Sequence, residues 1–380
     1  MASRRQWHLS FISAVVGAAL LAACGGGDSG PTTTRVVSFG DSLSDLGTYS
    51  VATSIAGTGA PPFFAGRFTT NTHTGYTAAS NSNTAAIWVE WVAARVGVPI
   101  TQAMLGFATT RIPCPAAANA ALASSCTAYG QGGALVTNPI GINHSVGALT
   151  DPAVTQVAAH LARFGSFSSS DVVLVWAGAN DGLAQLGAVQ AQQTSPAAAV
   201  AAMQTAGTEL AALVKNQIAA KGATRIAVLD FFDPVYFPNI AALDAGGQAL
   251  ARQFRTTFNT AMRAGLADTA GVAIIDMNAL FSDVATNPSK YGMTNVTSVA
   301  CDPAKMAPAT GGSALFCNAA SAAQLTAAGL PAAINAIRTG ASINTWFWAD
   351  GYHPSAAGHK VIGDYVISQI KALGWIAPNQ

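Results

Sequence analysis

Four short apolar runs, separated by long helix-like stretches, constrain the fold of this 380-residue chain more than any other feature. The runs are rich in β-branched residues and apolar at consecutive positions, which is typical of strands buried on both faces. They lie at residues 35–40, 171–178, 225–232 and 271–278. The helix-like stretches lie at residues 85–97, 195–222, 239–268 and 355–374. Strand and helix in alternation predict an α/β fold of three layers, in which helices cover both faces of a central parallel sheet.

The composition argues for one large globular domain that binds no nucleic acid. Charged residues make up only 9% of the chain, against about 25% in ordinary soluble proteins. The formal net charge is +1, and no basic stripe could hold phosphates. Since no linker-like segment interrupts the pattern up to residue 376, we expect residues 35–380 to form a single domain.

The first 34 residues predict export and attachment to a membrane. Residues 1–23 have a basic start and a short apolar stretch, as in a secretory signal peptide. The sequence "LAAC" at 21–24 resembles the bacterial lipobox, which implies a lipid on Cys24. An ordinary signal peptide cut near the same alanines is the alternative. Residues 24–34, rich in glycine, serine and threonine, predict a flexible tether.

The residue that follows Cys24 bears on the location of the exported chain. Gly25 stands where an inner-membrane retention signal usually has aspartate, and it favours an outer-membrane lipoprotein. A periplasmic or secreted protein is the alternative.

The other four cysteines are candidates for disulfides, because an exported chain meets an oxidising compartment. Three pairings of these cysteines are possible. The local pairs, Cys114 with Cys126 and Cys301 with Cys317, are the ones we favour, since each lies within a stretch of small residues outside the expected core.

Ser42 directly follows the first predicted strand, in the sequence "FGDSLSDLG" at 39–47. Parallel strands direct their carboxyl ends to one edge of the sheet, where ligands bind. A nucleophilic serine needs a histidine held by a carboxylate. Asp350 and His353 offer this pair in "WADGYHP" at 348–354. The alternative is an ordinary helix-start turn with a surface histidine.

Two further motifs lie between these, "GQGGA" at 130–134 and "WAGAND" at 176–181. In this order the four motifs resemble those of the GDSL group of the SGNH hydrolases, and most closely its bacterial lipase and lecithinase-like branch. The resemblance covers roughly residues 35–373. It implies a flavodoxin-like SGNH hydrolase fold.

The resemblance also implies roles for individual residues. Ser42 would be the nucleophile, His353 the base and Asp350 its partner, while Ser42, Gly133 and Asn180 would form the oxyanion hole. The family usually has Asn-x-Ala before the glycine pair, whereas this chain has "AYG" at 128–130. This departure leaves Gly132 and Gly133 as alternatives, of which we favour Gly133.

The neighbours of the oxyanion candidate and the remaining histidines have simpler interpretations. Asn180 could instead serve a turn or helix cap, and we expect Asp181 to cap the helix that follows. The histidines outside the candidate site show no spacing suited to a metal, so we expect surface or core positions for them and no metal ligand. They are His8, His73, His144, His160 and His359.

These observations predict a carboxylic-ester hydrolase, an esterase or lipase, that acts through an acyl-enzyme on a small-molecule or lipid ester, without a cofactor. A carbohydrate O-acetylesterase or an acyltransferase of the same fold is the alternative within the enzymes. A non-catalytic envelope lipoprotein that binds a ligand is the alternative outside them. The aromatic stretch at 231–239, which follows a predicted strand, is a candidate lining for an acyl groove.

Overall fold

The computed structural model describes residues 31–52, 66–72, 84–306, 312–327 and 335–377. Its centre is a parallel sheet in the order β1-β4-β5-β6. These strands are β1 (Arg35–Gly40), β4 (Asp171–Trp176), β5 (Ile226–Leu229) and β6 (Val272–Ile275). Each lies within one of the predicted apolar runs. All of β4 and nearly all of β1 is buried, so these strands are covered on both faces as predicted.

A short segment extends the sheet beyond β1. The N–H of Ser38 donates to Thr127 O at 2.9 Å, and the N–H of Tyr129 donates to Ser38 O at 2.8 Å. The chain therefore leaves β1 on one side, pairs at residues 127–129, and returns to the other side of β1 as β4. In open α/β sheets, ligands bind where strand order reverses in this way, which here is at the carboxyl ends of β1 and β4. This order agrees with the flavodoxin-like arrangement.

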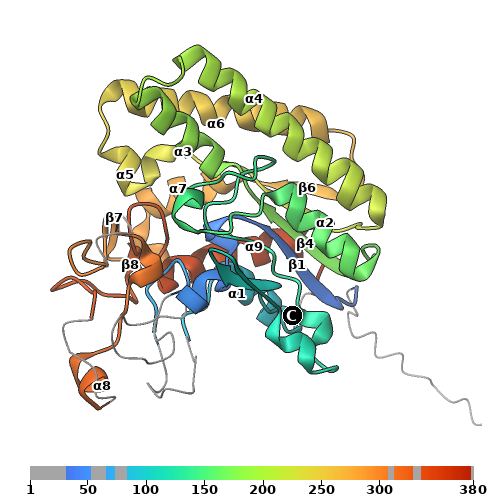
Figure 1. Ribbon diagram of the computed structural model, residues 1–380, viewed down its shortest axis with the longest axis horizontal. Coiled ribbons are helices and arrows are strands. Elements are labelled where there is room, and N and C mark those ends of the chain that lie inside the picture. The colour runs from blue at the N-terminus through green and yellow to red at the C-terminus, as the bar shows by residue number, and fades with distance from the viewer. Residues whose placement is uncertain (1–30, 53–65, 73–83, 307–311, 328–334, 378–380) are drawn as a thin grey trace, which may run out of the picture.

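Helices form a layer on each side of the sheet (Figure 1). On one side α4 (Pro196–Leu213) packs along α6 (Ala245–Leu266), and on the other α1 (Trp88–Arg95) packs against α9 (Ala356–Ala372). The predicted three-layer α/β/α fold is confirmed. The other described α-helices are α2 (Ala153–Phe164), α3 (Ala179–Gln190), α5 (Pro238–Ala241), α7 (Met277–Thr286) and α8 (Ala322–Ala327).

Local signals explain where several helices begin and end. Ser195 caps α4 and Ser355 caps α9, each accepting a backbone N–H with its hydroxyl. The single helix predicted at 239–268 is wrong, because Asp244 accepts the N–H of Gly247 and starts a new helix there. With the turns that continue it, α4 spans Pro196–Lys221 and is long and apolar enough to cross a membrane, but it packs on α3 and α6.

Regular structure also appears where the sequence shows no periodicity. An antiparallel hairpin joins β2 (Met104–Phe107) to β3 (Thr110–Pro113), and a parallel pair joins β7 (Asn295–Val299) to β8 (Trp346–Trp348). Both favoured local disulfides are present, Cys114–Cys126 and Cys301–Cys317.

The flexible tether was predicted to extend to residue 34, but its last three residues contact the folded domain. Thr32 O and Thr33 Oγ1 accept hydrogen bonds from the guanidinium of Arg225, and the N–H of Thr34 donates to Ser170 O. These contacts hold the last tether residues against the body of the protein. Residues 1–30, which include the predicted signal peptide and Cys24, lie outside the described residues.

Candidate active site

Ser42 lies at the end of β1 in a tight turn that the local sequence explains. Gly40 has φ +155°, and a Cβ there would lie 2.1 Å from Trp176 O, so only glycine fits between β1 and β4. Asp41 then accepts the N–H of Leu43 at 3.0 Å and starts a 3₁₀ turn over Ser42–Ser44. The turn leaves Ser42 at the edge of the sheet, buried but for 8% of its surface.

His353 meets Ser42 although the two residues are 311 positions apart in the chain. Its Nε2 lies 2.8 Å from Ser42 Oγ, and its Nδ1 lies 2.8 and 2.9 Å from the two carboxylate oxygens of Asp350. Because a carboxylate only accepts, Nδ1 carries the proton that it donates to Asp350. Nε2 is then free to accept the Ser42 hydroxyl proton.

Asp350 and His353 both belong to the loop between β8 and α9, and backbone groups hold the carboxylate in place. Its Oδ1 accepts the N–H groups of Tyr352 and His353, each at 2.8 Å, while its Oδ2 accepts the N–H of Ala314. Burial raises the pKa of Asp350, but the adjacent His353 and these N–H donors outweigh it and hold the pKa below its ordinary value. The carboxylate is therefore ionised at neutral pH.

The ring of Phe68 covers the imidazole. Its centroid lies 4.8 Å from that of His353, at an interplanar angle of 36°. The ring and the carboxylate together limit the orientations that the imidazole can adopt.

Two further predicted residues, Asn180 and Gly133, lie near the same edge of the sheet. Asn180 lies in the first turn of α3, directly after β4, and its Nδ2 donates to Ala134 O at 3.0 Å. One amide hydrogen of Asn180 is thus used, and the second remains available. Gly133 is the neighbour of Ala134, so Asn180 lies beside the glycine pair.

The two glycines of the pair differ in what their N–H groups do. The N–H of Gly132 donates to Asp45 at 2.8 Å, and Gly132 is buried beneath Phe68. Gly133 is partly exposed, and within the described residues its N–H has no hydrogen-bond partner. This difference favours Gly133 over Gly132 as a donor to a ligand.

Sequence reasoning missed two buried side chains that hold the turn of Ser42. Asp45 accepts the N–H groups of Gly47 and Thr48 as well as that of Gly132, and burial raises its pKa to about 6. Gln156, on α2, accepts the N–H of Gly40 and donates to its carbonyl. The motif "SDLG" could have signalled the local part of the Asp45 contacts, because aspartate often accepts N–H groups two and three residues ahead.

The expectation that Asp181 caps the next helix is wrong. The helix α3 begins at Ala179, so Asp181 lies inside the first turn, where its carboxylate accepts the N–H of Val136 at 3.2 Å. Burial, with smaller effects from Asp41 and Glu209, raises the pKa of Asp181 to about 7.

The described histidines outside the candidate site, His144, His160 and His359, belong to no group of side chains that could hold a metal ion. His160 and His359 are fully buried, and burial lowers their pKa values to about 4 and about 3. His144 is exposed. No group of three or more His, Cys, Asp or Glu side chains in the described part of the chain is placed to hold a metal ion. His8 and His73 lie outside the described residues.

A small apolar pocket of about 20 Å³ lies beside the first turns of α3. It lies between α3, α5 and α6, and it is lined by residues on either side of Asn180 and by the aromatic stretch after β5. Phe237 in this lining also contacts Tyr352, the neighbour of His353, with ring centroids 5.7 Å apart. The lining residues are Ala179, Gly182, Leu183, Leu186, Phe231, Pro234, Phe237, Ile240, Ala251 and Phe254.

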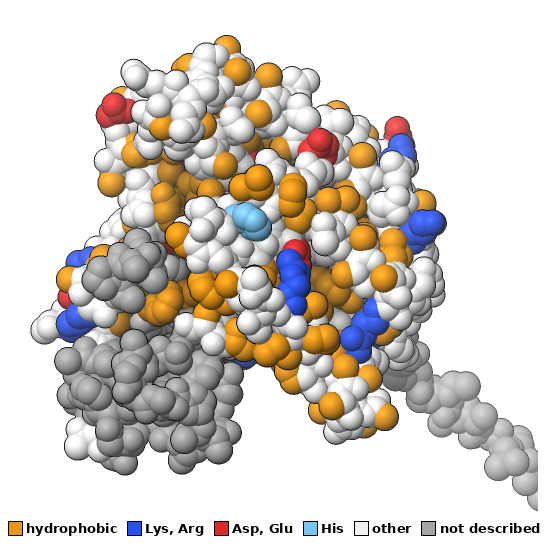
Figure 2. Space-filling model, in the orientation of Figure 1, with side chains coloured by type: hydrophobic (Ala, Val, Ile, Leu, Met, Phe, Trp, Pro, Cys, Tyr) orange, Lys and Arg blue, Asp and Glu red, His pale blue; other side chains and the backbone are white. Residues whose placement is uncertain are grey.

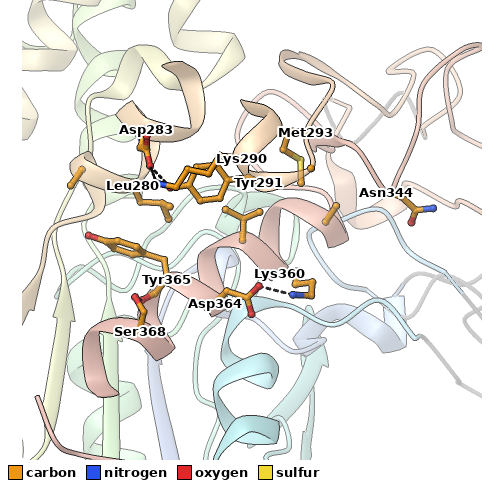
Figure 3. Close-up of a pocket in the computed structure, with 14 residues that line it drawn as sticks. Leu280, Asp283, Lys290, Tyr291, Met293, Asn344, Lys360, Asp364, Tyr365 and Ser368 are labelled. Carbon is orange, nitrogen blue, oxygen red and sulfur yellow. Dashed lines mark hydrogen bonds and ion pairs between the residues drawn. The ribbon is translucent and has the colours of Figure 1, made fainter. Parts of the chain in front are cut away.

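A larger cavity of about 730 Å³ lies between α7 and α9, away from Ser42 (Figure 3). Its charged side chains are paired with each other, Lys290 with Asp283 and Lys360 with Asp364. Neither the serine nor the histidine of the candidate site lines it. We therefore assign no reaction to this cavity.

Comparison with known proteins agrees with the motifs. A sequence model of the GDSL-like lipase/acylhydrolase family matches residues 36–366. Among solved structures, the chain is similar to the phospholipase A1 from Streptomyces albidoflavus NA297. The two share 16% sequence identity, the match covers 89% of this chain and 98% of that one, and the TM-score is 0.35. No curated protein sequence matches the chain.

Proposed function

The chain belongs to the GDSL-like lipase/acylhydrolase family, and from this premise we propose that it hydrolyses carboxylic esters through nucleophilic attack by Ser42. The observation that carries the proposal is the continuous hydrogen-bonded path from Ser42 Oγ through His353 to Asp350, with 2.8 Å at each step. A serine hydroxyl becomes an effective nucleophile only when a base of this kind accepts its proton.

In the first half of the reaction, Ser42 Oγ attacks the ester carbonyl while its proton moves to His353 Nε2. The ionised Asp350 stabilises the imidazolium that forms. The C–O bond to the alcohol then breaks, and His353 returns the proton to the leaving alkoxide, so that an acyl-Ser42 ester remains. In the second half, water attacks this ester with His353 again as base, and the acid departs. These steps need no metal or cofactor.

The negative charge that develops on the carbonyl oxygen needs hydrogen-bond donors. We assign this role to the N–H of Ser42, the N–H of Gly133 and the second amide hydrogen of Asn180. The partial exposure of Gly133 and the lack of a partner for its N–H among the described residues support the assignment.

We propose that the acyl group lies against the apolar pocket beside Asn180, whose volume of about 20 Å³ admits only a small group as the chain stands. Its lining contains no charged or amide side chain, which suits a hydrocarbon chain better than a sugar. The carbohydrate O-acetylesterase and acyltransferase alternatives are tested by rates on acetylated sugars, and by product analysis in the presence of an acceptor alcohol.

We also propose that the enzyme is exported and anchored to the outer membrane through a lipid on Cys24. The two disulfides support export, because such bonds persist in oxidising compartments. Mass spectrometry of the mature amino-terminal peptide tests the anchor. A mature chain without lipid, beginning beyond Cys24, would contradict it and favour a periplasmic or secreted enzyme.

The decisive experiment compares Ser42→Ala with Ser44→Ala on a series of soluble esters of increasing acyl length. Ser44 is a matched control, because it lies in the same turn, is also buried, and its hydroxyl has no partner among the described residues. We expect Ser42→Ala to reduce kcat by at least about 1,000-fold, and Ser44→Ala to retain activity within a few-fold.

A serine-directed phosphonate separates the enzyme from the non-catalytic alternative. We expect it to label Ser42 in the wild type and to leave Ser42→Ala unlabelled. A folded wild-type chain that hydrolyses no ester and takes up no label would favour the ligand-binding lipoprotein instead.

A further inference from the structure

The most exposed bulky apolar side chains in the described part of the chain occur together in one segment. Ile140 is 67% exposed and Val146 is 64% exposed, both within residues 138–150. Contact between large apolar side chains and water is unfavourable, so covering these side chains with an apolar surface would release free energy. The position of the segment indicates what covers them.

This segment rests directly on Gly133. The N–H of Ile142 donates to Gly133 O at 2.9 Å, and a Cβ on Gly141 would lie 2.2 Å from the same oxygen. Thr150 Oγ1 holds the base of the segment by accepting the N–H of Gly141 at 3.3 Å. The segment that carries Ile140 and Val146 therefore contacts the glycine that we place in the oxyanion hole.

The hairpin β2–β3 continues the apolar surface. The N–H of Ala108 donates to Gly147 O at 2.7 Å, and the ring of Phe107 lies against Gly147, the neighbour of Val146. Phe107 is 37% exposed and Ile112, on β3, is 40% exposed. We call Phe107, Ile112, Ile140 and Val146 the apolar rim.

The charge around the apolar rim is neutralised. Within residues 104–113 and 138–151, the only Lys, Arg, Asp or Glu side chains are Arg111 and Asp151. They form a double hydrogen bond with each other, at 2.6 and 2.8 Å. The face of the molecule drawn in Figure 2 shows few charged side chains among many apolar ones. A surface of this kind suits an uncharged partner, because no unpaired charge has to leave water.

We propose that the apolar rim docks the enzyme on the surface of a zwitterionic lipid layer, so that a lipid ester reaches Ser42 without first dissolving in water. This inference rests on the proposed ester hydrolysis. Side chains that protrude singly from a loop and a hairpin enter a fluid lipid surface without shape complementarity, whereas a protein partner would need a matching hollow.

The test uses the predicted mature chain, residues 24–380, with Cys24→Ser in every sample, so that neither the signal peptide nor a lipid on Cys24 can contribute to binding. The probe is phosphatidylcholine vesicles, and the variant is Ile140→Ser combined with Val146→Ser. Leu373→Ser is the matched control. Leu373 is 45% exposed, but it lies near Trp375, whose carbonyl accepts a hydrogen bond from Arg225 at the opposite edge of the sheet.

We expect the Leu373→Ser protein to sediment with vesicles like the unsubstituted protein, with little dependence on salt. The double variant should bind at least about tenfold more weakly. Its rate on a water-soluble short-chain ester should stay within about twofold, while its rate on an ester carried in the vesicles should fall in step with binding.

Three results would overturn the docking proposal: no vesicle binding by the unsubstituted protein, equal binding by the double variant, or a dimer in ultracentrifugation that the double variant abolishes. The last would assign the apolar rim to a second copy of the chain. The Ser42→Ala variant tests the two proposals separately, because it should lose ester hydrolysis and still bind vesicles normally. Rim-dependent binding without any ester hydrolysis would contradict the function and leave the docking intact.

Discussion

The carboxylate of Asp45 accepts the backbone N–H of Gly132 at 2.8 Å, across 87 positions of sequence. The other oxygen of the same carboxylate accepts the N–H groups of Gly47 and Thr48 at 2.8 and 2.7 Å. One buried side chain therefore joins the turn that carries Ser42 to the segment that carries Gly133. This contact holds the proposed nucleophile, Ser42, and the proposed oxyanion donor, Gly133, relative to each other.

Replacing Asp45 by asparagine should disturb that relationship with little change in volume. The amide keeps one acceptor for the local turn but turns its NH₂ group toward the N–H of Gly132, so two donors face each other. We expect kcat on a soluble ester to fall by about 10- to 100-fold, because small displacements of reacting groups have effects of this size. Steady-state kinetics at pH 8 would measure the fall in kcat, and thermal unfolding would show whether the variant is folded. An unchanged kcat would show that Gly132 needs no such anchor.

Replacing Asn180 by alanine should lower kcat more than it raises KM. The amide is proposed to donate to the oxyanion only as charge develops, and loss of one such donor typically lowers the rate by about 100- to 1,000-fold. Rates should be divided by the active sites titrated with a phosphonate, so that unfolded protein does not count. If the variant loses stability but keeps full activity per titrated site, the role of Asn180 is limited to its hydrogen bond with Ala134 O.

Removing the disulfide Cys301–Cys317 should reduce both stability and activity. The N–H of Cys301 donates to Ala349 O, and the N–H of Ala314, three residues before Cys317, donates to Asp350. The disulfide thus helps to fix the position of the Asp350 carboxylate, which orients His353. The double change Cys301→Ser with Cys317→Ser should lower stability by about 3 kcal/mol, and lower kcat in addition.

The disulfide Cys114–Cys126 provides the control for that experiment. It closes a loop of similar length, with a sequence separation of 12 against 16, so its removal should lower stability by a similar amount. We expect it to leave kcat per titrated site almost unchanged. Equal losses of kcat from the two double variants would argue against a specific role for Cys301–Cys317 at Asp350.

Asp181 should make the stability of the fold depend on pH near neutrality. Its pKa is raised to about 7 from an ordinary value of 3.8, so between these values the folded chain holds a proton that the unfolded chain has released. Stability therefore falls as pH rises from about 4 to about 7. Asp181→Asn, which keeps an acceptor for Val136, removes this loss and should be more stable by roughly 1–3 kcal/mol at pH 8.

Thermal unfolding of Asp181→Asn and wild type from pH 4 to pH 8 would check this expectation. The difference in Tm should be small at pH 4 and grow toward pH 8. A difference independent of pH would mean that the carboxyl does not titrate in this range.

Local signals were enough to predict the strands, because buried strands show continuous apolar runs. The pairing of Asp350 with His353 was predicted from their spacing together with the resemblance to the family, and in the folded chain it also depends on the N–H of Ala314, which donates to Asp350. The resemblance of the first and last motifs to those of the family predicted that Ser42 lies near this pair. Strand order did not predict it, because β8, which precedes the pair, belongs to a two-stranded sheet separate from that of β1. Helix ends were less certain, as Asp244 shows, because a single capping side chain divides an otherwise continuous helical pattern.

By itself, the sequence determined the four apolar strands of the central sheet and the residue types at the candidate site, and it favoured the two local disulfides over the other pairings, because each of these depends on neighbours along the chain. The tertiary structure alone decided that Asp45 occupies the N–H of Gly132 and leaves that of Gly133 available, that Ala314 supports Asp350, and that Asp181 binds Val136 instead of capping a helix. These contacts join residues far apart in sequence. Backbone N–H groups are chemically alike, so the sequence does not show which acceptor each one meets in the folded chain.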